Sequence, residues 1–342
     1  MKNKRQYARY QIVFLLLAFV LFAALIMNIN TGSVRISTAE IIRILGDSSS
    51  TQPEAVIIWI IRLPRLLSAA LFGGALSVSG FLLQTYFRNP IAGPFVLGIS
   101  SGARMFVGFV MIFLMSRAVY VSSYTIVAAA FIGSLFSMLI VLLLSQKVRN
   151  PSMLVVIGIM IGYVCSAVTD FFIAFAKDSH IANLTSWSMG SFSGAKWSDV
   201  QISAGIILTG LLAAVVMSKP INAFQLGESY AQSMGINIKV FRILLVLLSS
   251  LLSACATAFA GPISFVGIAV PHITKLLFNT AKPIVTIPGC FLCGAAFCMI
   301  CDLIARTVFS PTELAIGTVT SFFGAPIVIW LMVNGRRSQY DE

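Results

Sequence analysis

The sequence predicts an all-helical protein that crosses a membrane many times. Of its 342 residues, 58% are hydrophobic and only 10% are charged, whereas charged residues make up about a quarter of an ordinary soluble domain. A helix needs about 20 apolar residues to cross a bilayer, so this length accommodates roughly ten crossings and leaves little chain for a soluble domain. Any large aqueous site must therefore come from partner subunits.

Ten apolar stretches, separated by Gly, Pro, Asn and charged residues, are candidate spans of a single transmembrane domain, 1–342. They cover 11–29, 64–83, 94–115, 121–144, 152–175, 197–217, 240–260, 267–279, 284–304 and 313–333. The first follows four basic residues and lacks a small-residue cleavage site, so we expect a retained helix rather than a signal peptide. The eighth is short and follows Gly261-Pro262, which predicts irregular backbone buried in protein or lining a cavity.

The distribution of Lys and Arg predicts the orientation in the membrane. With a cytoplasmic N-terminus and ten crossings, 14 of the 23 basic residues fall in inner segments, 8 in outer segments and Arg104 within a span. An excess of basic residues marks the cytoplasmic side, so both termini are expected there. The net charge of +12 has the same explanation and requires no nucleic-acid partner.

Two polar stretches between spans are long enough to contain helices. The outer loop 30–61 includes Ser37-Thr38-Ala39-Glu40, a capping-box sequence that predicts the start of a short helix. The inner segment 218–239 is expected to form one or two short amphipathic helices that break at Gly227 and Gly235. Such an elbow suits the docking of a soluble partner, although a helix resting on the membrane surface has the same pattern.

Three blocks of sequence, in this order along the chain, carry a resemblance to a known family. The first runs from Arg62-Leu63-Pro64-Arg65 through Gly73-Gly74 to Asn89-Pro90-Ile91-Ala92-Gly93-Pro94-Phe95-Val96-Leu97-Gly98, the second from Leu226-Gly227-Glu228 to Met234-Gly235, and the third is Gly261-Pro262-Ile263-Ser264-Phe265-Val266-Gly267 with Pro271-His272. Together they resemble the FecCD-type permeases, the membrane subunits of type II ABC importers for iron-siderophores, haem and cobalamin. The sequence departs from the family pattern at Gly93, Arg104 and Lys275.

The resemblance implies a set of partners and a function. The partners are two cytoplasmic ATP-binding subunits, an extracytoplasmic substrate-binding protein or lipoprotein, and a second permease that is either an identical copy or a paralogue. The implied function is import of an iron-siderophore complex across the bacterial cytoplasmic membrane, with haem or cobalamin as alternative cargo. No cofactor is expected, and no G-x-x-x-x-G-K-[ST] phosphate loop occurs in the chain, so ATP hydrolysis is assigned to a separate subunit.

Two other functions are compatible with a polytopic helical protein. An autonomous secondary transporter is an alternative because 65–98 and 242–267 form a faint inverted repeat. A membrane-embedded enzyme would need a nucleophile, a base and an orienting acid at one depth, and the sequence groups no such residues. We therefore expect a transport subunit rather than an enzyme.

The resemblance also implies contacts at the outer face. Arg62, Arg65 and Arg306 are expected to dock acidic residues of the binding protein, because the planar guanidinium group suits a carboxylate. Ordinary snorkelling of arginines at helix ends is the simpler alternative. Asp302 lies four residues before Arg306, a spacing that allows an ion pair within one helix and would lower the value of Arg306 for docking.

Three further groups of residues take roles from the resemblance. The ATPase-coupling surface is expected at Leu226, Gly227, Glu228, Ala231, Ser233 and Gly235. A cytoplasmic gate is expected at Asn150, Pro151 and Ser152, although a basic turn that only fixes topology explains this loop equally well. The structural motif comprises Asn89, Pro90, Gly98, Gly261, Pro262, Gly267, Pro271 and His272.

Cys290-x-x-Cys293 and Cys298-x-x-Cys301 have a spacing that is typical of metal sites in soluble proteins. Here they share one apolar helix, and at about 1.5 Å per residue the outermost pair is roughly 16 Å apart, too far to hold one metal. We therefore predict no metal site and interpret the cysteines as small residues at a packed helix interface. Arg104 and Asp170 also lie inside predicted spans, where charge is costly, and the sequence assigns neither a role.

Overall fold

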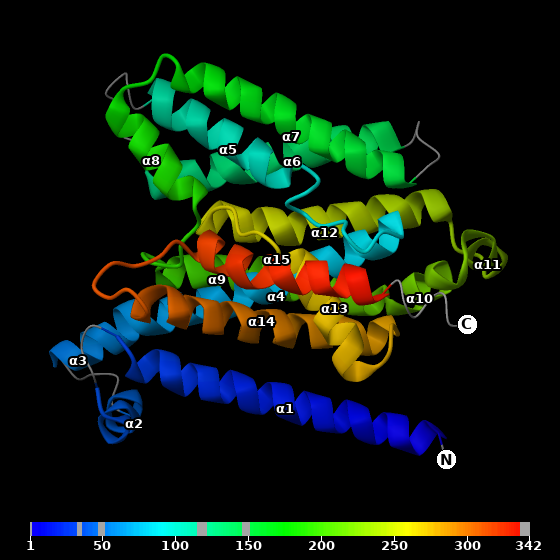
Figure 1. Ribbon diagram of the computed structural model, residues 1–342, viewed down its shortest axis with the longest axis horizontal. Coiled ribbons are helices and arrows are strands. Elements are labelled where there is room, and N and C mark those ends of the chain that lie inside the picture. Colours follow the sequence, from blue (N-terminus) through cyan, green and yellow to red (C-terminus); the bar gives the residue numbers. More distant parts are fainter. Residues whose placement is uncertain (1, 33–35, 47–51, 115–121, 146–150, 336–342) are drawn as a thin grey trace.

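The computed structural model describes residues 2–32, 36–46, 52–114, 122–145 and 151–335. Within these ranges all regular secondary structure is helical, and the long helices lie side by side as one bundle (Figure 1). Seven helices in the described ranges are long and apolar enough to cross a membrane, and Ile99–Leu114, Val266–Phe278 and Ile316–Trp330 are shorter apolar helices. The prediction of an all-helical polytopic membrane protein is confirmed.

The helices follow in this order along the chain. The first part contains α1 (Lys2–Asn30), α2 (Thr38–Gly46), α3 (Pro53–Val56), the π-helix η1 (Ile57–Arg62) and α4 (Leu63–Phe87). The middle part contains α5 (Ile99–Phe109), the π-helix η2 (Val110–Leu114), α6 (Ser123–Ser145), α7 (Pro151–Ile173), α8 (Asp178–Ser188) and α9 (Trp197–Val216). The last part contains α10 (Ser218–Leu226), α11 (Glu228–Ser233), α12 (Ile238–Ala260), α13 (Val266–Phe278), α14 (Pro283–Thr307) and α15 (Ile316–Gly335).

The outer loop 30–61 is more helical than the sequence predicts. The capping-box helix is present as α2, and the Ser37 hydroxyl accepts a hydrogen bond from the Glu40 amide at 3.3 Å. The second span begins at Pro53 rather than at 64, because α3, η1 and α4 run on without interruption to Phe87. Pro53 suits the first turn of a helix, and the apolar residues of η1 extend the span beyond the arginines.

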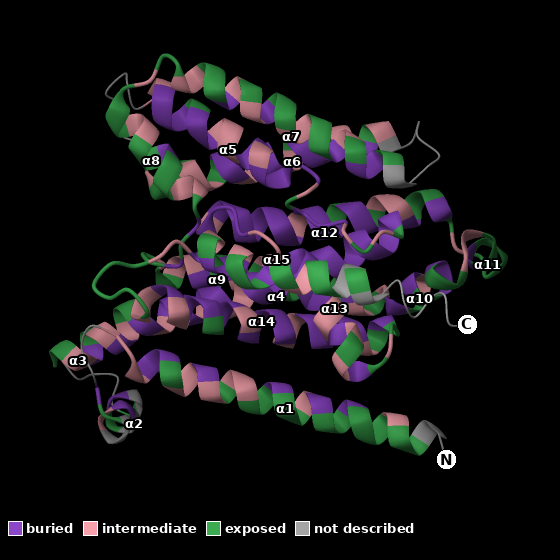
Figure 2. Cartoon of the chain, in the orientation of Figure 1, coloured by how far each residue is buried: buried purple, intermediate pink, exposed green. Residues whose placement is uncertain are grey.

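α4 is the central helix of the bundle. The most apolar part of the continuous span Pro53–Phe87, which includes α4, is 83% buried, against 28% for α1. α4 packs against α14, α12, α13 and α9. Figure 2 shows α4 and α12 as largely buried and α1 with a broad exposed face. Exposed apolar faces on the peripheral helices are expected where lipid is the solvent.

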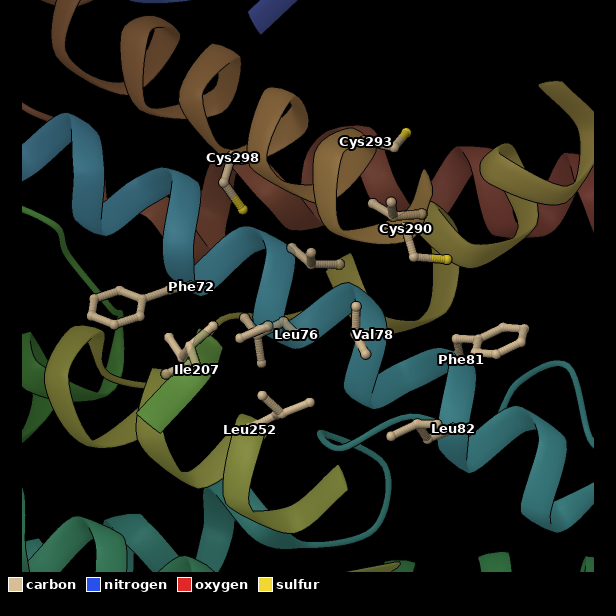
Figure 3. Close-up of a cluster of buried hydrophobic side chains, with 14 of the residues drawn as sticks. Phe72, Leu76, Val78, Phe81, Leu82, Ile207, Leu252, Cys290, Cys293 and Cys298 are labelled. Carbon is tan, nitrogen blue, oxygen red and sulfur yellow. The ribbon is translucent and has the colours of Figure 1, made fainter. Parts of the chain in front are cut away.

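Small residues allow α4 and α14 to approach closely. A Cβ on Gly73 would overlap the carbonyl oxygen of Gly294, and a Cβ on Gly294 would overlap that of Gly73. Cys298 lies at the same contact, with its Sγ 2.8 Å from where a Gly73 Cβ would lie. Cys290, Cys293 and Cys298 are spaced along α14 and pack in the core beside the α4 side chains (Figure 3).

Different short helices lie at the two ends of the bundle. α1 begins and α15 ends at the end where α10 and α11 lie, which we call the elbow end (Figure 1). α2, α3 and α8 lie at the opposite end, which we call the α2 end. The predicted orientation places the elbow end in the cytoplasm.

Candidate functional site

Arg65 is at the centre of a buried ionic network at the α2 end. It lies in the first turn of α4, where Pro64 occupies an early helix position. Its Nε donates to both carboxylate oxygens of Asp302 on α14 at 3.1 Å, and its Nη2 donates to Asp302 Oδ1 at 2.9 Å. Its Nη1 donates to Glu313, just before α15, at 3.0 Å. One guanidinium group therefore joins α4, α14 and the segment that leads to α15.

Arg306 extends this network to α1. Its Nη2 donates to the backbone carbonyl of Asn28 at 2.6 Å and to the Asn28 side chain at 2.8 Å. Its Nε lies 3.9 Å from Asp302, so the predicted ion pair within α14 is present but long. Asn28 is itself buried and donates back to the Met299 carbonyl at 3.1 Å. These bonds fix the end of α1 on α14.

Arg62 completes the cluster from the end of η1. Its Nη1 donates to the carbonyl of Ile29 at the end of α1. Gly32 leaves room for the guanidinium, because a Cβ there would lie 2.7 Å from Arg62 Nη2. Arg62 is 5% exposed and Arg65 9%, and the side chain of Arg306 is 8% exposed. The three predicted docking arginines thus lie together, but the chain's own groups surround them.

The sequence missed the acidic partners of this network. Asp302 was expected to pair with Arg306, yet its close partner is Arg65, 237 positions away. Glu313 was assigned no role from the sequence. Its carboxylate is 46% exposed and pairs with buried Arg65. No local pattern in the sequence brings 65, 302 and 313 together.

The elbow is held in shape by internal contacts. Gly227 has φ +143° and separates α10 from α11, and Gly235, with φ +80°, ends the segment where a break was predicted. Glu228 pairs with Arg242 on α12 at 2.8 Å, and Ala231 is fully buried. Arg88, just after α4, stacks on the Phe224 ring at 5.0 Å. The elbow therefore contacts both α12 and the residue that follows α4.

The exposed side chains of the elbow differ from those chosen on the sequence. Leu226 is 67% exposed, as a partner contact requires. Glu228, however, forms an ion pair with Arg242, and Ala231 is buried. Ser233 donates its hydroxyl to the Tyr230 carbonyl at 2.8 Å. Tyr230 and Met234, which were not among the expected coupling residues, are 47% and 63% exposed. Leu226, Tyr230 and Met234 are thus the exposed large apolar residues of the elbow, and we call them the elbow tip.

Several residues of the structural motif meet where α4, α13 and the 89–98 segment contact one another. Gly267 begins α13 beside α4 and the 89–98 segment, where a Cβ would lie 2.8 Å from Pro94. Gln84 on α4 donates to the carbonyls of Gly267 and Ile268 at 3.4 and 3.2 Å. His272 contacts the Pro90 carbonyl at 3.1 Å. The 89–98 segment therefore packs on the start of α13, and the Gln84 and His272 side chains contact backbone carbonyls there, inside the bundle.

The remaining motif residues set the backbone of these segments. Asn89 Oδ1 accepts from the Ile91 amide at 3.1 Å and stabilises the turn after α4. Gly98 has φ +77° and lies against Gly158 and Gly162 of α7. Gly261 has φ +73° and begins the Gly261-Pro262 break after α12. Pro271 lies inside α13, one residue before His272.

The structure describes only two of the three residues of the predicted cytoplasmic gate. Asn150 lies outside the described residues. Pro151 is the first residue of α7, a position that suits proline, and Ser152 follows it. The gate assignment stays a prediction.

The comparisons identify the family to which this architecture belongs. A model of the FecCD transport family matches residues 17–334. The chain belongs to the FecCD transport family. It is 34% identical over 339 residues to the hemin transport system permease protein HmuU of Yersinia pestis, covering 98% of this chain and 99% of that protein. It is also 34% identical over 334 residues to the vitamin B12 import system permease protein BtuC of Shigella boydii, covering 97% and 98%.

The fold of this FecCD permease is similar to that of a solved transporter. That protein is an ABC transporter of the metal-chelate type in an inward-facing conformation, with a TM-score of 0.83 and 26% identity over 95% of this chain and 99% of the other. The chain is thus the multi-pass permease subunit of a type II ABC importer and not an enzyme. Such importers work with a separate ATPase and a substrate-binding protein, and this family sets aside the secondary-transporter and membrane-enzyme alternatives.

Proposed function

We propose that this permease carries a metal chelate across the bacterial cytoplasmic membrane, with an iron-siderophore complex as the first candidate. The observation that supports the proposal is the similarity to a metal-chelate ABC transporter over nearly the whole chain. Relatives named for hemin and vitamin B12 keep haem and cobalamin as alternative cargo. A second permease, identical or paralogous, completes the pathway in this proposal.

The proposed ATPase contact is the elbow tip. Leu226, Tyr230 and Met234 present apolar surface beyond the membrane-spanning helices, at the end that the charge distribution assigns to the cytoplasm. Partly exposed apolar side chains on short helices are suited to a groove on a partner protein. The Glu228–Arg242 pair then serves to transmit force, because it ties the elbow to α12 at 2.8 Å.

A reconstitution experiment tests the importer function. We expect the permease alone in liposomes to move no chelate under an ion gradient, whereas the permease with its ATPase and loaded binding protein accumulates chelate with ATP. Met234→Asp should then lower ATP-driven uptake by about tenfold, because it places a charge in an apolar contact. Asn222→Asp, an exposed change on α10 outside the elbow tip, is the control and should retain uptake. Chelate accumulation by the permease alone would contradict the proposal.

The proposed binding-protein contact is the arginine network at the α2 end. Arg65 is already held by Asp302 and Glu313, and of these two only Glu313 is accessible. A carboxylate of the binding protein would therefore reach Arg65 Nη1 by taking the place of Glu313. Reversing the charge of Arg65 is a poor test, because it also leaves buried Asp302 without its partner.

Glu313→Gln tests docking without removing the buried Arg65–Asp302 pair. We expect it to tighten binding of the binding protein to the reconstituted importer by roughly three- to tenfold, because it removes a competing charge. The measurement is a binding titration at several salt concentrations. Glu54→Gln on α3 makes the same change of charge at the same end, without an ion pair in the described structure. Equal effects of the two variants, or weaker binding with Glu313→Gln, would contradict docking at Arg65.

A further inference from the structure

Arg104 is a charged residue inside the apolar helix α5. Its Nε is buried and has no hydrogen-bond partner within the described structure. None of the ion pairs found among the described residues includes it, and Asp170, an exposed carboxylate on α7, is not paired with it. Arginine stays protonated in proteins. An ionised side chain in a membrane span is costly and ordinarily faces a partner or a transport pathway.

The neighbours of Arg104 along α5 place it beside the middle of α7. Ser101, one turn earlier, has its Oγ 3.5 Å from where a Cβ on Gly162 would lie. Gly108, one turn later, faces Thr169 of α7 and Leu184 of α8, which lie 3.6 and 3.2 Å from its Cβ position. Residues three and four apart share a side of a helix, so Arg104 lies between these two contacts. At about 1.5 Å per residue, Gly162 and Thr169 are roughly 16 and 27 Å from the start of α7, so Arg104 lies between these depths, within a hydrocarbon core about 30 Å thick.

The guanidinium group is not enclosed by this chain. Arg104 is partly exposed, and of its nitrogens only Nε is both buried and unpartnered. The two terminal nitrogens therefore remain accessible. Arg65 offers the contrast, because it lies near a helix end and is neutralised by Asp302 and Glu313. Arg104 therefore carries a positive charge inside a membrane span, and no residue of the described chain neutralises it.

We propose that Arg104 contacts the cargo during translocation and favours chelates that carry free carboxylate groups. This inference rests on the proposed importer function and narrows its cargo. A guanidinium group recognises carboxylates through charge-assisted hydrogen bonds, and these are stronger where water is scarce. A single contact of this kind attracts the chelate into the pathway but binds it weakly enough for release, and transport requires both. The chelate class is carboxylate siderophores and haem, through its propionates, rather than neutral hydroxamates or cobalamin.

The test uses the complete importer, with ATPase and cognate binding protein, in proteoliposomes. The probes are ferric citrate and haem, which are anionic, and ferrichrome and cyanocobalamin, which carry no free carboxylate. We expect the natural importer to take up an anionic probe. Arg104→Gln should lower that uptake by about tenfold or more, and Arg104→Lys should keep it within about threefold of the natural rate. The thermal midpoint of Arg104→Gln should be equal to or above that of the natural protein, because an unpaired charge inside a membrane span is removed.

Met105→Gln is the matched control, since it places the same side chain at the adjacent position of α5 and should retain uptake. Uptake by Arg104→Gln equal to that of the natural protein would overturn the inference and indicate that Arg104 faces lipid rather than the cargo. A lower midpoint together with lost uptake, not restored by Arg104→Lys, would show a structural role instead. Uptake of neutral probes alone would overturn the cargo class while leaving the importer function intact. Failure to move any probe would overturn both proposals.

Discussion

Replacing Asp302 with Asn is expected to lower the free energy of unfolding of the permease by about 3 kcal/mol or more. Asp302 is 2% exposed and is the deepest acidic group of the arginine network. It neutralises Arg65 at 2.9 Å and Arg306 at 3.9 Å, and both of those side chains are at most 10% exposed. Removing its charge leaves buried Arg306 without a carboxylate and Arg65 with only the half-exposed Glu313, which costs far more than an exposed ion pair contributes.

The network gives this loss a structural consequence. Arg65 joins α4 to α14, and Arg306 joins α14 to the end of α1. Without Asp302, α1 should loosen first, because Arg306, which Asp302 helps to hold, donates to the carbonyl and side chain of Asn28 near its end. The measurement is the thermal and denaturant midpoint of the purified permease in detergent.

Glu313→Gln is the matched control for this stability test. Glu313 also bonds Arg65, but its carboxylate is 46% exposed, so its loss should cost less than about 1 kcal/mol. A loss of stability in Asp302→Asn no greater than in Glu313→Gln would show that the buried carboxylate is not what holds this end together.

Gly80→Ala is expected to prevent normal folding. A Cβ at position 80 would overlap the carbonyl oxygen of Gly267 and lie 2.5 Å from its carbonyl carbon. Both obstacles are backbone atoms, so no side-chain rotation relieves the clash. α4 and α13 must separate, and the Gln84 bonds to the Gly267 and Ile268 carbonyls at 3.4 and 3.2 Å are then lost. Overpacking of this kind costs about 3 kcal/mol or more.

Folded yield checks this prediction. Gly80→Ala should give little monodisperse permease on size-exclusion chromatography in detergent, and its thermal midpoint should fall. Gly205→Ala on α9 is the control, because nothing lies within 4 Å of its Cβ position. That change should be neutral or stabilising by up to about 1 kcal/mol, since alanine favours a helix. A wild-type yield and midpoint in Gly80→Ala would mean that α4 and α13 are not in close contact.

Local patterns in the sequence were sufficient for the class of fold and for several elements. Apolar runs predict helices because a bilayer forces every span to satisfy its own backbone, and the described helices follow those runs. The capping box at Ser37 and the elbow broken at Gly227 and Gly235 depend on backbone rules that act within a few residues. The π-helix η1, which prolongs the second span to Pro53, was missed because its arginine was taken as a boundary.

By itself, the sequence determined that this protein is a polytopic helical membrane protein with an elbow and a break at Gly261-Pro262, because these features follow from hydrophobicity and local backbone geometry. Only the tertiary structure decided which groups are available for function. It turned Arg65 inward onto Asp302 and Glu313, 237 and 248 positions away, and left Tyr230 and Met234 exposed while burying Ala231. The physical reason is that burial and ion pairing depend on which helix faces meet, and facing is set by close packing between distant helices rather than by the period within one.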